Sequence, residues 1–440
     1  MRPSSSKLVL TSTVALVLSA PILTGSASGA ADVPAWSGVT TRIASSANHL
    51  PFGGWGMGPD ISADGRFVAF GSSAADLVPD DTNGAIDVFV VNLATGTIER
   101  VSVGSNGREG SGLSYSPALS TNGRFVAFTS YAGDLVRGDT NHSTDIFVHD
   151  RRTDKTRRVS VRSDGTDVHG DSRLATISGD GQLIAFQSDA TKLVRHDTNE
   201  ADDVFVHDSS TRTTNRVSVS TDGEQGHYYS RTPDMSKDGR FVSFYSVSPN
   251  LTAHDTNGFD DIFVRNIERK TTHLVSLGNH EQQGKQPSTS SFLSADGRYV
   301  AFVSEAGNLV KSDTNHAYDV FVRDRNTKAT VRASVGLGGQ EGNDNSFASG
   351  ISTDGRRILF VSQASNWLAA DTHTQDVFIR NTKTDSTHWV SVGVNGELAN
   401  GSCDTGGISG NGDSVVFASE ATNLIPDDTN GFADIFLRTR

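Results

Sequence analysis

The sequence has too few cysteines for a disulfide cross-link within the chain. Its 440 residues include a single cysteine, Cys403, so no disulfide can form within the chain. Beyond Ala30, no apolar stretch is long enough to cross a bilayer. Basic residues are also scarce, with 38 Lys and Arg against 51 Asp and Glu, and the resulting charge of −13 argues against nucleic acids and anionic membranes as partners. A hydrophobic core, bound ions, or both must therefore stabilise the fold.

The N-terminal segment 1–30 has the pattern of a secretory signal peptide. Arg2 and Lys7 form a basic start, Leu8–Ala20 an apolar stretch, and "GSASGA" a small-residue cleavage region that ends at Ala30. The apolar stretch is short for an uncleaved membrane anchor, which is the alternative. We therefore expect a cleaved signal peptide over residues 1–30 and a secreted mature protein.

A short motif recurs along the rest of the chain. It reads "SADGRFVAF" from Ser62, and its serine returns at positions 120, 178, 236, 294, 352 and 409. Five of the six intervals are equal to that between Ser62 and Ser120, and the last is shorter by one. The missing position falls in "DTHTQD" at 371–376, which we interpret as part of a loop. Seven copies at a nearly fixed period indicate a repeat architecture.

Each copy has the pattern of four short strands separated by turns. In the second copy the strands are expected at 114–120, 124–130, 145–150 and 157–161, with an Asn-Gly turn between the first two. Runs such as "FVAF" and "DIFVHD" are apolar on nearly both faces, which is typical of strands covered by neighbouring sheets. The sequence therefore predicts an all-β fold, a seven-bladed β-propeller of four-stranded antiparallel blades.

The two ends of the chain predict how the ring closes. "TTRIAS" around Arg42 precedes the equivalent sequence around Arg100 by one full repeat, so it is a fourth-strand sequence with no first three strands before it. The chain ends after a third-strand sequence, "DIFLRTR". We predict a 3+1 closing blade in which residues 39–45 pair beside 434–440. Residues 31–38 are then a short lead-in, and residues 39–440 form a single propeller.

The repeat also resembles a known family. The pattern S-x-D-G-R-x-V-A-F-x-S, followed by D-V/I-F-V-x-D-x-x-T, is similar to the WD40-like PD40 repeat of the TolB-type propellers. The resemblance covers essentially the whole mature chain and implies the fold rather than the function. The chain lacks the Gly-His and Trp-Asp signatures of true WD40 repeats, and it has seven copies where TolB has six. The Pal-binding role of TolB is therefore not carried over.

Each copy contains two aspartates close together, as in "DDTNGAIDVFV" at 80–90. In a structural interpretation, the Asp and Asn side chains accept backbone N–H bonds, shape a turn and tie the loop to the following strand. In the other interpretation, aspartate, asparagine and aspartate at positions 1, 3 and 7 supply three oxygen ligands to a calcium ion. The loop lacks the other features of an EF-hand, so the structural interpretation is favoured.

Calcium is the one candidate ion, and the sequence predicts no required cofactor. An additional acid, Asp80 or Asp427, precedes the triplets of the first and last copies. The sixth copy has His373 in place of the asparagine and a shorter spacing, so it would bind calcium worst. The candidate ligands are Asp81, Asn83, Asp87, Asp139, Asn141, Asp145, Asp428, Asn430 and Asp434.

A ligand site is expected where the seven copies differ, because shared positions serve the scaffold. The loops before each first strand differ most, and they should lie around the mouth of the central channel on the same rim as the "DTN" loops. Aromatic residues and two arginines gather there, and we predict a ligand site from Trp55, Tyr115, Arg173, Tyr228, Tyr229, Arg231 and Phe347. Such a set suits a peptide, a protein loop or a sugar.

The sequence contains neither an HExxH metal motif nor a G-x-S-x-G nucleophile motif. It therefore predicts a monomeric, non-catalytic module that binds a protein, peptide or glycan through the channel-mouth face. One alternative is a hydrolase or lyase with its site at the central channel, since a propeller can assemble a site from residues distant in sequence. The other is a calcium-stabilised structural protein of the cell surface.

Overall fold

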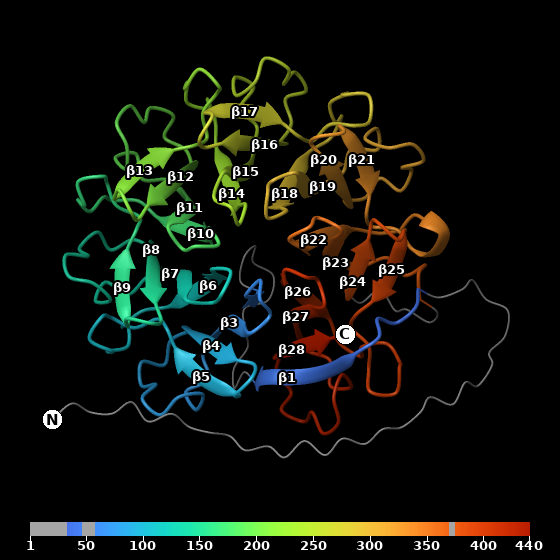
Figure 1. Ribbon diagram of the computed structural model, residues 1–440, viewed down its shortest axis with the longest axis horizontal. Coiled ribbons are helices and arrows are strands. Elements are labelled where there is room, and N and C mark those ends of the chain that lie inside the picture. Colours follow the sequence, from blue (N-terminus) through green and yellow to red (C-terminus); the bar gives the residue numbers. More distant parts are fainter. Residues whose placement is uncertain (1–32, 46–57, 369–374) are drawn as a thin grey trace.

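The computed structural model describes residues 33–45, 58–368 and 375–440 of the chain. Its strands form seven four-stranded antiparallel sheets, arranged as blades around a central axis (Figure 1). Within the described residues, the helical structure consists of a single 3-10 turn, η1 (Leu337–Gly339). The predicted all-β, seven-bladed propeller is therefore confirmed. The predicted signal peptide lies outside the described residues.

The blades are numbered one to seven in chain order, and each contributes one strand to the wall of the channel. These first strands are β2 (Asp60–Ile61), β6 (Ser114–Leu119), β10 (Ser172–Ile177), β14 (Ser230–Met235), β18 (Ser288–Leu293), β22 (Ser346–Ile351) and β26 (Cys403–Ile408). The second strands are β3 (Phe67–Ser72), β7 (Phe125–Ser130), β11 (Leu183–Ser188), β15 (Phe241–Ser246), β19 (Tyr299–Ser304), β23 (Arg357–Ser362) and β27 (Ser414–Ser419).

The third and fourth strands lie progressively further from the axis (Figure 1). The third strands are β4 (Asp87–Asn92), β8 (Asp145–Asp150), β12 (Asp203–Asp208), β16 (Asp261–Asn266), β20 (Asp319–Asp324), β24 (Asp376–Asn381) and β28 (Asp434–Thr439). The fourth strands are β5 (Thr97–Arg100), β9 (Lys155–Arg158), β13 (Thr213–Arg216), β17 (Thr271–Leu274), β21 (Ala329–Arg332), β25 (Ser386–Trp389) and β1 (Val39–Ser45).

The core of every blade is built on one pair of phenylalanines. The "VAF" and "DVF" runs place a phenylalanine on the second strand directly opposite one on the third, as with Phe128 and Phe147. Their rings stack at 5.8 Å between centroids, and both side chains are fully buried. The other six blades repeat the pair at 5.6 to 5.9 Å. These strands are buried on both faces because a neighbouring blade covers each face, which explains their nearly continuous apolar sequences.

The Asp-Gly and Asn-Gly turns fasten neighbouring blades as well as joining strands. Gly181 adopts a positive φ of 78°, and a Cβ there would lie 2.1 Å from the ring of Phe125 in the preceding blade. Glycine thus supplies the left-handed conformation and leaves room for the neighbouring aromatic ring.

The ring closes as predicted. β1 pairs antiparallel with β28, from Val39 opposite Thr439 to Ser45 opposite Asp434, with a bulge between Arg42 and Ala44. The N-terminal strand therefore lies on the outer edge of the seventh blade, beside the last strand of the chain (Figure 1).

The described part of the lead-in also packs into the fold. Val33 and Trp36 are buried, and backbone bonds join them to Trp367 and Trp389 of the sixth blade. The Trp36 carbonyl accepts hydrogen bonds from the guanidinium of Arg438 on β28. The lead-in thus connects the sixth blade to the seventh. Among the described residues, no helix is long and apolar enough to span a membrane.

We expect the Trp36→Ala variant to lose about 3–5 kcal/mol of unfolding free energy, because it removes a buried indole at the junction of two blades. Denaturant unfolding of the purified protein measures this loss. Val39→Ala is the matched control, since Val39 is 68% exposed nearby and its truncation should change the free energy little. Equal effects in both variants would show that the lead-in does not stabilise the ring.

Candidate functional site

Every blade has a buried aspartate at the first residue of its third strand. In the first six blades this carboxylate accepts a hydrogen bond from a serine hydroxyl two residues beyond the fourth strand. The same hydroxyl accepts the N–H that follows the aspartate. The aspartate therefore ties the third strand to the chain leaving the fourth, and it fixes the corner from which the "DTN" loop departs.

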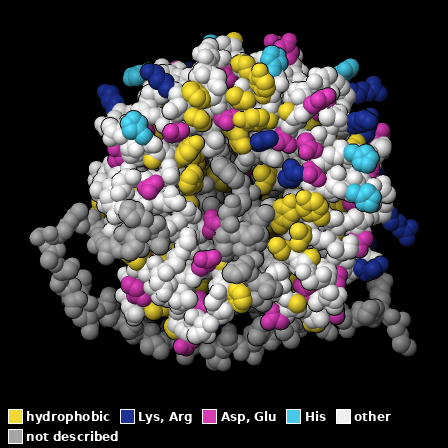
Figure 2. Space-filling model, turned by 180° about the vertical axis from the view of Figure 1, so that it is seen from behind, with side chains coloured by type: hydrophobic (Ala, Val, Ile, Leu, Met, Phe, Trp, Pro, Cys, Tyr) yellow, Lys and Arg dark blue, Asp and Glu magenta, His cyan; other side chains and the backbone are white. Residues whose placement is uncertain are grey.

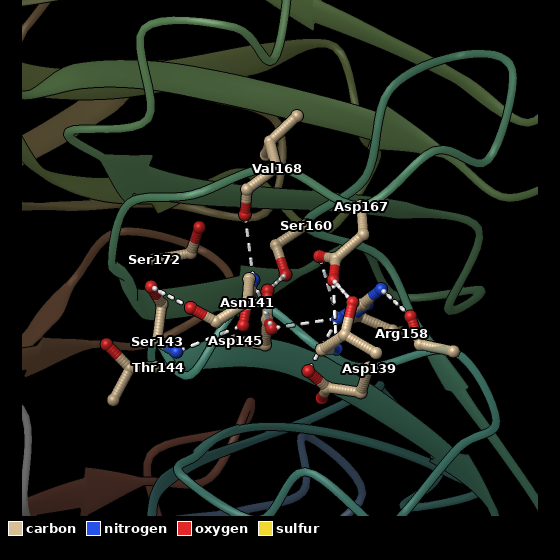
Figure 3. Close-up of polar contacts among 12 residues, drawn as sticks. Asp139, Asn141, Ser143, Thr144, Asp145, Arg158, Ser160, Asp167, Val168 and Ser172 are labelled. Atoms are coloured by element: carbon tan, nitrogen blue, oxygen red, sulfur yellow. Dashed lines mark hydrogen bonds and ion pairs between the residues drawn. The ribbon is translucent and has the colours of Figure 1, made fainter.

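The second blade shows the whole corner (Figure 3). Arg158, the last residue of β9, places Nη1 2.9 Å from Asp139 Oδ1, 3.0 Å from Asp145 Oδ2 and 3.0 Å from Asp167 Oδ1. Asn141 donates through Nδ2 to Asp145 at 3.0 Å. Three carboxylates thus surround one guanidinium, which is nearly buried.

The same arrangement is repeated with variations. Arg100, Arg216 and Arg332 take the place of Arg158 in the first, third and fifth blades, and Arg42 takes it in the seventh. Three corners contain three acidic groups close enough to hold a metal ion: Asp81, Asp87 and Glu109; Asp139, Asp145 and Asp167; Asp313, Asp319 and Glu341. In each of these three, an arginine Nη1 already contacts all three carboxylates.

In the candidate calcium sites, the asparagines do not direct their side-chain oxygens toward the aspartates. Asn83 and Asn141 donate through Nδ2 to Asp87 and Asp145, and their Oδ1 atoms accept the backbone N–H two residues on. Asn430 makes the same contacts with Asp434 and with the N–H of residue 432. The contacts are those of an Asx turn, as in the structural interpretation. The seventh corner brings Asp428 and Asp434 together around Arg42.

Burial opposes ionisation of these aspartates. It raises the pKa of Asp145 to about 6, although the nearby Arg158 guanidinium acts in the opposite direction. The carboxylate is retained because the arginine, the serine and the asparagine together surround it with donors.

The central channel contains a cavity of about 500 Å³, lined by the first strands and the turns that follow them. Its wall is mostly small or apolar, with alanine, glycine, leucine, isoleucine and phenylalanine side chains. Four charged residues interrupt it: Asp60, Asp234, Lys237 and Asp404. Three of these, Asp60, Asp234 and Lys237, stand at repeat positions where the other blades have uncharged residues. They lie near the Ser-x-Asp-Gly turns, at the end of the channel opposite the "DTN" loops.

Asp60 and Asp234 occupy the same repeat position in the first and fourth blades. Asp60 Oδ2 accepts the N–H of Leu119 at 2.7 Å, and Asp234 Oδ2 accepts the N–H of Leu293 at 2.7 Å, so each joins its own first strand to the next blade. Lys237 donates to the Leu119 carbonyl at 3.2 Å, and it therefore spans the third blade.

The two carboxyl groups have raised pKa values for the same reason. Burial raises the pKa of Asp234 to about 6, and Lys237 and the Leu293 N–H partly oppose this. Burial also raises the pKa of Asp60, and the Lys237 ammonium is the strongest opposing influence there. This end of the channel thus brings the carboxyl groups of Asp60 and Asp234 and the Lys237 ammonium into a mostly apolar enclosure, an arrangement that suits proton transfer.

The predicted ligand residues gather at the opposite, "DTN" end in two groups. The Arg231 guanidinium lies 4.5 Å from the Tyr229 ring centroid and donates to Asp202 at 2.6 Å. Tyr229 donates its hydroxyl to Asp260 at 3.1 Å. Tyr228 is 56% exposed beside them.

The second group, Tyr115 and Phe347, lies on other blades. Together with Tyr228 and Tyr229 we call these residues the aromatic band. The ring centroids of Tyr115 and Tyr131 lie 6.5 Å apart. Burial raises the pKa of Tyr115, and the nearby Arg173 guanidinium opposes this. Phe347 packs 6.0 Å from Tyr318 and also lines the cavity. Trp55 lies outside the described residues. Figure 2 shows hydrophobic, basic and acidic side chains around the central hollow.

Sequence reasoning missed Asp60, Asp234 and Lys237. The signal was present in the alignment of the seven copies. Two residues before the repeat serine, the copies read Asp60, Ala118, Thr176, Asp234, Phe292, Gly350 and Gly407. One residue after it they read Ala63, Thr121, Gly179, Lys237, Ala295, Thr353 and Gly410.

Comparison with solved structures finds the same fold in enzymes. An oligogalacturonate lyase from Vibrio parahaemolyticus matches with a TM-score of 0.55 and 14% identity, over 91% of this chain and 93% of that one. An oligogalacturonate lyase in complex with manganese matches with a TM-score of 0.54 and 14% identity, over 91% and 92%.

A putative TolB from Agrobacterium tumefaciens also matches, with a TM-score of 0.42 and 14% identity over 80% of this chain and 96% of that one. The predicted likeness to TolB-type propellers is confirmed as a likeness of fold. No family model and no curated protein matches the sequence.

These findings correct the main functional prediction. A non-catalytic binding module was expected because no catalytic motif could be read from the sequence, but two of the structures that match over 91% of the chain are lyases. The charged residues of the channel come from three different blades, so no single linear motif contains them. The predicted alternative, a hydrolase or lyase at the central channel, agrees better with both observations.

We expect Arg158→Met to cost about 3–5 kcal/mol of unfolding free energy, because it leaves three partly or fully buried carboxylates without their counter-charge. Arg66→Met is the control, since Arg66 pairs with Asp64 at an exposed turn and should contribute less than about 1 kcal/mol. Urea unfolding of both variants measures the difference. A small effect for Arg158→Met would mean that the carboxyl groups become protonated at little cost.

Proposed function

We propose that this protein is an enzyme that cleaves a glycosidic bond at its central channel, as a lyase or a hydrolase. The observation that supports it is the group formed by Asp60, Asp234 and Lys237, at positions where the other blades have uncharged residues. Support also comes from the matching oligogalacturonate lyases, which share the fold at 14% identity. The segment 1–30 favours secretion, which would bring the enzyme to extracellular oligosaccharides.

Asp234 is assigned as the proton donor to the departing glycosidic oxygen. Its carboxyl group is enclosed, and a pKa of about 6 keeps a substantial fraction protonated near neutral pH. Asp60 is assigned as the base: burial raises its pKa, and the Lys237 ammonium is the strongest influence that opposes this and favours the ionised form. In elimination the base removes a carbon-bound proton, and in hydrolysis it removes a proton from the attacking water.

The aromatic band at the opposite mouth would hold the sugar chain. Tyr115, Tyr229 and Phe347 offer ring faces, and the guanidinium groups of Arg173 and Arg231 are partly exposed beside them. Arginine groups at the entrance suit an acidic oligosaccharide such as an oligogalacturonate.

A manganese site like that named for one of the lyases does not fit the described channel residues. The acidic groups that could hold an ion lie at the blade corners rather than in the cavity. We derive no catalytic step through a metal. Calcium is proposed instead for the corners, because every ligand offered there is oxygen, and only where no arginine lies between the aspartates.

We expect Asp234→Asn to lower kcat by about 10²–10⁴-fold, because the amide keeps the hydrogen bond to Leu293 but cannot donate a proton as an acid does. Activity is measured on oligogalacturonate and on neutral oligosaccharides. Mass spectrometry distinguishes the reactions, since hydrolysis adds one water across the broken bond and elimination adds none. Asp180→Asn is the control, because Asp180 lies in the turn after β10, outside the cavity lining, and its substitution should leave activity unchanged.

The pH profile provides a second test of the same assignment. Since the donor must be protonated, kcat/KM of the wild type should fall as the pH rises through about 6, and Asp234→Asn should lose this limb. Absence of cleavage on every oligosaccharide, or full activity of Asp234→Asn, would refute the proposal.

A further inference from the structure

The corner of the fourth blade keeps both aspartates but has no arginine between them. β17 ends in Leu274, where β5, β9, β13 and β21 end in arginine. Asp255 and Asp261 are 6% and 0% exposed. Within the described part of the chain, no cationic side chain forms an ion pair with either of them.

Only uncharged donors reach this pair among the described residues. Gln283 Nε2 donates to Asp255 Oδ1 and to Asp261 Oδ2, at 2.8 Å in both cases. Asn257 donates to Asp261 Oδ2 at 2.8 Å, and Ser276 donates to its Oδ1. The remaining oxygen, Asp255 Oδ2, is buried without a hydrogen-bond partner. Burying two carboxylates without a counter-charge costs free energy, so a bound cation would stabilise this corner.

The third blade shows where that cation would lie. Its Gln225 contacts Asp197 Oδ1 and Asp203 Oδ2 at 2.9 Å, as Gln283 contacts their equivalents. In addition, Arg216 Nη1 lies 3.3 Å and 3.0 Å from the same two oxygens.

The Arg216 Nη2 atom donates to the backbone carbonyl of His196 at 2.8 Å. His254 occupies the equivalent position in the fourth blade, one residue before Asp255. The two corners therefore offer the same carboxylate oxygens, Asp197 Oδ1 and Asp203 Oδ2 in the third blade and Asp255 Oδ1 and Asp261 Oδ2 in the fourth, and only the third has a guanidinium between them.

We propose that the fourth blade binds one calcium ion between the carboxylates of Asp255 and Asp261. Two carboxylates balance the double charge, and carboxylate and carbonyl oxygens are the ligands that calcium prefers. Water completes the coordination. The sixth blade also lacks the arginine, but Trp389 Nε1 lies 3.3 Å from Asp376 there, and Asp371 is outside the described residues. This site is separate from the channel and does not depend on the enzymatic proposal.

The test compares the full chain with its Leu274→Arg variant, which places in the fourth blade the arginine that five other blades have. After treatment with EDTA, thermal unfolding and calorimetric titration are followed with calcium and with magnesium. We expect calcium to raise the midpoint of the wild type by several degrees with one ion bound per chain, and magnesium to do so much less. Leu274→Arg should show neither the shift nor the binding, because the guanidinium occupies the site.

The reverse change supplies a second arm if Leu274→Arg does not fold. Arg216→Leu gives the third blade the same set of ligands, and it should bind a second calcium ion per chain. Unchanged wild-type unfolding in calcium would overturn the proposal and show that one of the two aspartates is simply protonated. An equal calcium response in the wild type and in Leu274→Arg would also overturn it, by placing the ion at another corner.

Discussion

The fold depends on a carboxylate buried at the start of each third strand. In six blades this carboxylate accepts a hydrogen bond from a serine hydroxyl, and the hydroxyl oxygen accepts one from the next backbone N–H of the third strand. The contact joins two strands and a loop at one point, so it determines where the loop leaves the blade. In the seventh blade Ala44 occupies the position of the serine, and Asp434 keeps its contacts with Arg42 and Asn430.

Both proposed sites lie where a blade departs from the repeat. A position that is the same in all blades can be explained by the scaffold, as the stacked phenylalanines show. Asp60 and Asp234 have no such explanation, since the remaining five blades build the same wall with uncharged residues. Leu274 departs from the repeat in the opposite way. It stands where other blades have a charged arginine, while the aspartates that such an arginine would contact are still present.

The fold could be predicted from the sequence because its signals are local and repeated. The turns, the apolar strands and the fourth-strand sequence around Arg42 indicated seven blades and the correct closing pair, 39–45 with 434–440. The site could not be predicted in the same way. Arg158 meets Asp139 only because β9 folds back beside the loop, and Lys237 meets Leu119 across an intervening blade. In the less favoured calcium interpretation the asparagines supply oxygen ligands, whereas Asn141 turns its amide nitrogen toward Asp145.

The closing blade sets the order in which the ring can be completed. Arg42 and Asp434, which contact each other at 3.0 Å, are separated by 392 residues. β1 precedes all the other described strands in the chain, yet its partner strand β28 follows them all. Blades one to six can each form from contiguous chain, while β1 keeps an unpaired edge until β28 has been made. A chain truncated anywhere before β28 would therefore be an open arc with two exposed edges, which gives proteases and chaperones a direct way to recognise an unfinished copy.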